Sequence, residues 1–223
     1  MRLGENAPAE GKAFLPILGR PMLYWTLRAF EASSAIAAVV VVAPPGEEGR
    51  AGEVARAAGV KVRDIVAGGA ERQDSLGAGL SALTGMGGED PLVAVHDAAR
   101  PLVRPSDISR VVHAARRSGA AILAVPVKDT IKVVGKDERI EETPDRDTLW
   151  IAQTPQVGRA SLLRAGLARA KAGGTVSTDE ANLLESLGMR VPVVLGDFAN
   201  IKVTTADDVI VAEALLKVRE VPA

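Results

Sequence analysis

Residues 95–101, VHDAARP, end a near-continuous apolar run with a histidine, an aspartate and an arginine. A buried strand has no use for such charges, so they mark the place where the chain leaves the core. A carboxylate at the end of a strand can hold Mg²⁺, and an arginine three residues later can face an anion. Asp97 and Arg100 are therefore candidates for metal and phosphate binding. An ordinary helix cap beside a solvated arginine is the alternative reading.

A glycine pair lies in AGGAERQDS, residues 67–75, directly after a predicted strand and before a predicted helix. Such glycines let backbone N–H groups approach a ligand closely, although a plain strand-to-helix turn has the same letters. GAGLSA, residues 77–82, matches a dinucleotide-binding fingerprint, but it lies inside a helical pattern instead of joining a strand to a helix. We therefore discard the second motif and keep the first.

The other candidates are isolated cations and two histidines. Lys202 lies between two apolar residues of NIKV, a predicted short strand, which is a costly place for an ammonium group unless an anion is near. An outward-facing strand lysine is the alternative. Lys12 and Arg2 belong to a Gly/Pro-rich opening segment that could wrap phosphates or be a disordered tail. We interpret His96 as structural, hydrogen-bonded within its turn, and His113 as an exposed helix residue.

The elements that must position these residues alternate between short apolar runs and helix-period segments. The apolar runs are AIAAVVVVA, VKVRDIV, PLVAVH and AAILAVPV, and helical segments separate them. This alternation predicts an α/β fold with a doubly wound, mostly parallel sheet covered on both faces. In such sheets ligands bind where loops leave the carboxyl ends of the strands. HDAARP and AGGAERQ both occupy such positions.

The pattern changes at residue 128, where KDTIKVVGKDERIEET predicts two short strands joined by a charged turn. A lone hairpin is barely stable in water, so we expect this protruding arm, residues 128–152, to lie on a partner subunit in a homodimer. Arg146 lies on the return of the arm. Further on we predict helices around 158–172 and 179–188, strands at VPVVLG and NIKV, and a closing helix from about Thr204.

Length and composition limit the possible functions of the protein. The 223 residues are enough for one ample core, so residues 1–223 are predicted to form a single domain with the arm as an appendage. A net charge of −1 gives no bulk electrostatic footprint for nucleic acid. The absence of cysteine favours a cytoplasmic location, and no apolar stretch reaches membrane-spanning length, so we expect no membrane partner.

Singly these signals are weak, but their order along the chain is specific. The blocks are GKAFLPILGRPMLYWTL, GGAERQDS, VHDAARP, PVKDTIK, DRDTLWIAQTPQ, STDEA and NIKVTTADD. Together they resemble the 2-C-methyl-D-erythritol 4-phosphate cytidylyltransferases of the non-mevalonate isoprenoid pathway, over almost the whole chain from about Arg2. The resemblance implies a Rossmann-like nucleotidyltransferase fold. It also implies a reaction over Mg²⁺ in which a phosphate oxygen of methylerythritol phosphate attacks the α-phosphorus of CTP and pyrophosphate leaves.

The same resemblance implies a role for individual residues. Asp97 corresponds to the metal ligand. The cations that neutralise the triphosphate correspond to Lys12 and Arg2, while Lys202 would stabilise charge at the α-phosphate. The remaining roles are nucleotide binding by Gly69, Ala70, Ser75, Asp97 and Ala98, and methylerythritol phosphate binding by Arg100, Thr130, Arg146, Thr154 and Lys202. Arg146 would also be catalytic, with Lys12, Lys202 and Arg2, and would reach the partner subunit's site.

Two departures from the family pattern leave alternatives open. The family begins with a buried strand and a Gly-rich turn, which we expect to precede Met1 because a central strand and its loop are needed there. Ala199 stands before NIKV, where an acidic residue is common, so a second carboxylate near the metal is in doubt. A pentitol (ribitol) phosphate cytidylyltransferase and a non-catalytic homologue without the phosphate loop are the competing hypotheses; the small Ala99 favours the methylerythritol enzyme.

Overall fold

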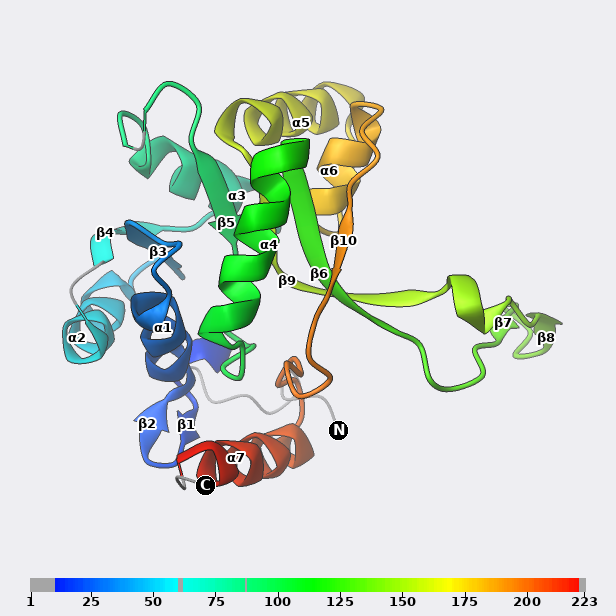
Figure 1. Cartoon of the computed structure of the whole chain (residues 1–223), viewed down its shortest axis with the longest axis horizontal. Helices are drawn as coiled ribbons and strands as arrows, with labels where there is room; N and C mark the ends of the chain where they lie inside the picture. The colour runs from blue at the N-terminus through cyan, green and yellow to red at the C-terminus, as the bar shows by residue number, and fades with distance from the viewer. Residues whose placement is uncertain (1–10, 60–61, 87, 221–223) are drawn as a thin grey trace.

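A computed structural model describes residues 11–59, 62–86 and 88–220 (Figure 1). Within these residues the body holds two main sheets, besides the short antiparallel pair β1–β2. The smaller is a parallel pair, β3 (Val39–Ala43) with β4 (Val62–Ala67). The larger has the strand order β10–β6–β9–β5, in which β6 and β10 are parallel and β9 runs antiparallel to both of its neighbours. Its strands are β5 (Leu92–Val95), β6 (Ala120–Pro126), β9 (Trp150–Arg159) and β10 (Val193–Leu195).

Helices separate the strands along the chain, as the sequence pattern predicts. They are α1 (Met22–Ala32), α2 (Glu48–Ala58), α3 (Arg72–Ala82), α4 (Pro105–Ser118), α5 (Ala160–Gly173), α6 (Glu180–Ser186) and α7 (Ala206–Glu220). Near the start lie η1 (Lys12–Phe14) and the short pair β1 (Pro16–Ile17) and β2 (Arg20–Pro21), packed beside α7 in Figure 1. Among the described helices none is both long and apolar enough to cross a membrane.

Helix α4 shows how sequence produces these elements. Pro105 opens it, where the missing N–H costs nothing, and Gly119 ends it with φ of 82°. Ile108, Val111, Val112 and Ala115 recur at helical spacing, and all four are buried. This stripe packs on β6, whose residues Ala120–Val125 are all buried as well. Together α4 and β6 form the centre of the larger sheet's core.

Two details differ from the sequence-based expectation. NIKV is not a strand: its backbone is irregular, with the Asn200 N–H donating to the Asp197 carbonyl at 2.9 Å and the Val203 N–H donating to the Ala99 carbonyl at 2.8 Å. The predicted helix at about 158 begins two residues later, at Ala160, because β9 continues through Arg159. β9 runs antiparallel because the chain re-enters the sheet on its way back from the arm.

The arm is a hairpin that stands away from the body in Figure 1. β7 (Val133–Val134) pairs antiparallel with β8 (Ile140–Glu142), and η2 (Arg146–Thr148) lies on the return toward β9. The hairpin prediction is therefore confirmed. Within the arm and its base the side chains of Val134, Ile140, Trp150 and Ile151 are exposed, which is a large apolar surface for so small a projection.

Candidate active site

Asp97 lies at the carboxyl end of β5 and is paired on both of its oxygens. Its Oδ1 accepts from Arg72 Nη1 at 2.8 Å, and its Oδ2 lies 2.9 Å from the Lys202 ammonium. Burial alone would raise the pKa of this carboxyl, but Arg72 and Lys202 hold it at about 2. Asp97 is therefore a carboxylate at any physiological pH, as a metal ligand must be.

Arg72 is anchored from behind by a second, more deeply buried carboxylate. Arg72 begins α3 and Glu180 begins α6, so two helix starts face each other here. Arg72 Nη2 donates to both Glu180 oxygens, at 2.9 and 3.0 Å, and Nε donates to Oε1 at 3.2 Å. Only 2% of Glu180 is exposed. Burial would lower the pKa of Arg72, but Glu180 and Asp97 raise it instead, so the guanidinium stays charged.

Lys202 reaches Asp97 because its loop is fixed at several points. Arg100 Nη1 donates to the Asn200 carbonyl at 2.8 Å and Nη2 to the Ala152 carbonyl at 3.3 Å. The buried Asn200 in turn donates from Nδ2 to the Thr154 carbonyl at 3.0 Å. Arg100 Nε lies 3.9 Å from Asp97 Oδ2, so the same guanidinium that holds the loop also contributes charge to the site.

His96 is structural, as the sequence suggested. Its Nε2 lies 3.1 Å from the Arg100 carbonyl and its Nδ1 2.9 Å from the Thr154 hydroxyl, which also accepts from the Asp97 N–H at 3.1 Å. Burial lowers the pKa of His96 to about 4, so the ring is neutral near pH 7. His96 and Thr154 thus fix the backbone that presents Asp97. His113 is exposed, as predicted.

The glycine pair makes a tight turn at the start of α3. A Cβ on Gly69 would lie 2.2 Å from the Asp74 Cβ, so no larger residue fits there. The Gly69 N–H donates to the Ser75 hydroxyl at 3.2 Å. Gly69 and Ala70 are exposed at the surface. The tight strand-to-helix turn is therefore present, and the use of this loop for close approach of a ligand stays a prediction.

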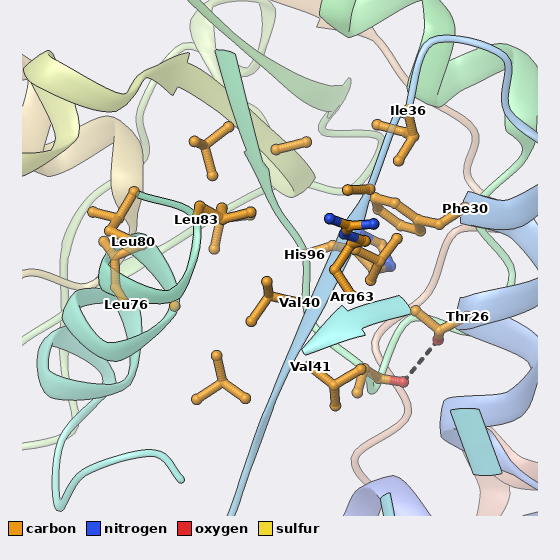
Figure 2. Close-up of a pocket in the computed structure, with 18 of the residues that line it drawn as sticks. Thr26, Phe30, Ile36, Val40, Val41, Arg63, Leu76, Leu80, Leu83 and His96 are labelled. Atoms are coloured by element: carbon orange, nitrogen blue, oxygen red, sulfur yellow. Dashed lines mark hydrogen bonds between the residues drawn. The ribbon is translucent and has the colours of Figure 1, made fainter. Parts of the chain in front are cut away.

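The other predicted residues that the structure describes form no hydrogen bond or ion pair with the Asp97 side chain. Ala98 is next to Asp97, and its carbonyl accepts from the Thr26 hydroxyl at 3.1 Å, as Figure 2 shows. Lys12 is exposed in η1. Thr130 and Arg146 are exposed on the arm, where Arg146 Nη1 donates to the Lys128 carbonyl at 3.1 Å. Arg2 lies outside the described residues.

Sequence reasoning missed Arg72 and Glu180. Both lie in blocks that resemble the family, GGAERQDS and STDEA, but the sequence alone assigned no function to either residue. The signal that could have found them is their position: each is a charged residue at the start of a predicted helix, and α/β sheets bring such starts together at the carboxyl ends of the strands. Their contact across 108 positions is visible only in the fold.

The cluster carries more positive than negative charge. Arg72, Arg100 and Lys202 face the two carboxylates Asp97 and Glu180. Within the described residues no three acidic, histidine or cysteine side chains gather as a metal site. Mg²⁺ is commonly held by one or two carboxylates and by substrate phosphates, so a single carboxylate, Asp97, whose Lys202 partner is half exposed, fits a metal that arrives with a nucleotide. The arrangement suits binding and reaction of a polyphosphate.

Comparison with known proteins agrees with this chemistry. The family model for IspD, 2-C-methyl-D-erythritol 4-phosphate cytidylyltransferase, matches residues 1–218. A protein of that name from Pelotomaculum thermopropionicum is 47% identical over 94% of this chain and 87% of its own length, and one from Geobacter metallireducens is 45% identical over 96% and 94%.

A solved structure extends the likeness to the fold. The crystal structure of 2-C-methyl-D-erythritol 4-phosphate cytidylyltransferase from Thermus thermophilus superposes with a TM-score of 0.79 at 37% identity, covering 95% of this chain and 96% of that one. Identity at this level over nearly complete chains leaves no room for a different fold family. The chain belongs to the 2-C-methyl-D-erythritol 4-phosphate cytidylyltransferase family.

Proposed function

We propose that this protein transfers the cytidylyl group of CTP to 2-C-methyl-D-erythritol 4-phosphate in isoprenoid precursor synthesis. A phosphate oxygen of the alcohol phosphate forms a bond to the α-phosphorus of CTP, the bond from that phosphorus to the β-phosphate oxygen breaks, and pyrophosphate leaves. The attacking oxygen is already anionic, so no protein base is required. The observation that carries the proposal is the Asp97 cluster, because a charged, pre-positioned set of cations is what this reaction needs.

The cations would act by neutralising negative charge. Lys202 is half exposed, with 48% of its side chain accessible, so its ammonium can leave Asp97 for an incoming phosphate. Arg72 is held by Glu180 and stays in place when Asp97 takes a new partner. Lys12 and Arg2 would contact the β- and γ-phosphates. Charge that develops on the α-phosphoryl oxygens is stabilised most by groups that need not move during the reaction.

Asp97 is the residue that would hold Mg²⁺. The ion, when bound with the nucleotide, would neutralise the triphosphate and polarise the phosphorus–oxygen bond that breaks. The low pKa of Asp97 keeps the carboxylate ready for a cation. His96 and Thr154 fix the backbone of this residue, so the ligand oxygen is held where β5 ends.

The nucleotide base and the second substrate would occupy the two sides of Asp97. Exposed backbone at Gly69 and Ala70, with Ser75 behind it, would read cytosine and ribose. Arg100 would meet the methylerythritol phosphate, since its Nε is buried without a hydrogen bond. Thr130 and Arg146 are on the arm, and we infer that they serve the neighbouring subunit of a homodimer. The exposed apolar residues of the arm would form the contact between the subunits.

The cysteine-free sequence fits a cytoplasmic enzyme.

A pyrophosphate-release assay on the full-length protein tests the proposal. Pyrophosphate should form from CTP and methylerythritol phosphate in the presence of Mg²⁺, and ribitol phosphate at the same concentration should give little. Turnover with ribitol phosphate alone would assign the protein to pentitol phosphates. Tight CTP binding in calorimetry without turnover on either alcohol would contradict the assigned acceptor, and no CTP binding would indicate a non-catalytic homologue.

A further inference from the structure

The side chain of Gln156 is a buried polar group in the middle of the larger sheet. It lies in β9, and only 2% of it is exposed. The next residue, Val157, is apolar and buried as well. A buried amide costs free energy unless it is hydrogen-bonded, so the partners of Gln156 indicate what the position does. One weak contact stays within β9, from Nε2 to the Gln153 carbonyl at 3.5 Å.

The two shorter bonds of Gln156 both go to the start of α6. Its Nε2 donates to Asp179 Oδ2 at 3.0 Å, and its Oε1 accepts from the Ala181 N–H at 2.7 Å. Asp179 is the N-cap residue of α6, and its Oδ1 accepts from the Asn182 N–H at 2.9 Å. One side chain of β9 therefore holds α6 at the residues immediately before and after Glu180.

The position of Glu180 depends on these bonds. Helix α6 is only seven residues long, and a helix so short is held by its tertiary contacts more than by its own backbone. Glu180 accepts from both Nη2 and Nε of Arg72, and Arg72 Nη1 donates to Asp97. Because hydrogen bonds weaken steeply when they are misaligned, a shift of about 1 Å at Glu180 would loosen the guanidinium.

The same strand also fixes Asp97 from its other side. Gln156 pairs with Val95 in the register of β9 and β5, and Asp97 follows Val95 by two residues. The Thr154 hydroxyl of β9 accepts from the Asp97 N–H at 3.1 Å. β9 thus holds the carboxylate through β5 and Thr154, and it holds the partner guanidinium of Arg72 through Gln156 and α6. The contacts form a closed ring around the ion pair.

We propose that Gln156 is a positioning residue for the nucleotide side of the reaction. By fixing the start of α6 it holds Glu180, and through Glu180 it holds Arg72 against Asp97. The consequence for CTP rests on the proposed function, whereas the consequence for Arg72 does not. The two consequences are therefore measured separately.

The test uses a loss, a restoration and a control. Gln156→Met keeps the shape of the side chain and removes both bonds to α6. Gln156→Glu combined with Asp179→Asn restores them with one donor and acceptor exchanged, since the new carboxylate can accept from the new amide and from the Ala181 N–H. Ser161→Ala removes a bond of 2.8 Å to Asp90 in the first turn of α5, and so controls for loss of a helix-start bond elsewhere.

The first readout is exchange of the Arg72 Nε–H with water, followed by NMR, with the resonance assigned by its absence in Arg72→Lys. Gln156→Met should speed this exchange about 10-fold, and the double variant should bring it back to within about 2-fold of wild type. Should Gln156→Met not fold, Asp179→Asn alone removes one bond and should speed exchange about 3-fold. Unchanged exchange, or equal acceleration in Ser161→Ala, would overturn the proposal.

The second readout separates positioning from a general loss of structure. Calorimetry should show CTP binding with Mg²⁺ weakened about 10-fold in Gln156→Met and restored in the double variant. The KM for methylerythritol phosphate should change less than about 2-fold, because Arg100 is held by carbonyls outside α6. Equal losses for both substrates would contradict the positioning role. Absence of CTP binding in wild type would instead contradict the proposed function, and exchange at Arg72 would still decide the inference.

Discussion

The Asp97 cluster and the arm carry the two halves of the predicted site, and they are built in opposite ways. Asp97 is paired on both oxygens, Arg72 and Arg100 are held by buried partners, and the loops around them are tied by hydrogen bonds. On the arm, Arg146 is exposed and contacts only its own hairpin in the described structure, through Lys128. Within one chain the cluster residues are therefore tied to buried partners, whereas the arm residues are not.

This difference bears on the proposed homodimer. A charged cluster inside one subunit can be complete because the fold brings its members together. The arm has exposed Val134, Ile140, Trp150 and Ile151 and little of its own to pack against. We expect cluster substitutions to act within a subunit and arm substitutions to act between subunits.

The largest effect is expected for Asp97→Asn. The change keeps the shape but removes the negative charge that would bind the metal and that now balances Arg72 and Lys202. Turnover should fall by about 1000-fold, and calorimetry should show weakened binding of Mg²⁺ with CTP. Asp207→Asn, at an exposed position on α7, is the control. Wild-type Mg²⁺ dependence in Asp97→Asn would contradict the assignment.

Arg146→Ala should lower turnover by about 100-fold, because the variant would lose one contact with the phosphate group of methylerythritol phosphate. Arg139→Ala, on the exposed turn of the same hairpin, should have no such effect. If the arm serves the partner, mixing Arg146→Ala chains with Asp97→Asn chains should restore part of the activity in hybrid dimers. No recovery from mixed dimers whose formation has been verified would place Arg146 in its own subunit's site or outside any site.

Glu180→Gln should have a smaller effect, about 10-fold on CTP affinity in the presence of Mg²⁺. The amide still fills the buried space but loses the charge that restrains Arg72, so the guanidinium is less well fixed. The KM for methylerythritol phosphate should change little. Glu185→Gln, exposed on the same helix, is the matched control. Equal losses for both variants would show that Glu180 has no special role at the nucleotide side.

Much of the fold and half of the site could be predicted from sequence because the signals were local. Apolar runs between helical segments predicted β3, β5, β6 and the helices around them. A charged ending on an apolar run singled out Asp97 and Arg100. NIKV misled because two apolar neighbours of Lys202 suggested a strand, whereas the fold uses Ile201 and Val203 to pack an irregular loop into the core beside α7.

The rest depended on contacts between distant residues. The pairing of Arg72 with Glu180 joins positions 108 residues apart, and nothing in the local sequence of either indicates the other. The fixed turn at Gly69 could be anticipated only as a glycine, since its requirement comes from Asp74 folding back over it. The proposed roles of Thr130 and Arg146 involve a second chain, whose placement no single-chain pattern encodes.

The smallest effect is expected for His96, the histidine that supports the Asp97 cluster. The arm, residues 128–152, contains no histidine. Burial lowers the pKa of His96 from 6.5 to about 4. Between these values the unfolded chain binds a proton that the folded chain does not, so stability should fall as pH falls from about 6.5 towards 4 and should lose nothing further from this group below that. The contribution is about 1 kcal/mol per pH unit, measured as the slope of unfolding free energy between pH 6 and 5.

His96→Gln should reduce that slope by about 1 kcal/mol per pH unit, which corresponds to close to one proton taken up on unfolding. His113→Gln, at an exposed position on α4, should leave the slope unchanged. An identical slope in wild type and His96→Gln would mean that the ring is protonated in the folded protein, and its bonds to Thr154 and Arg100 would then need a different assignment.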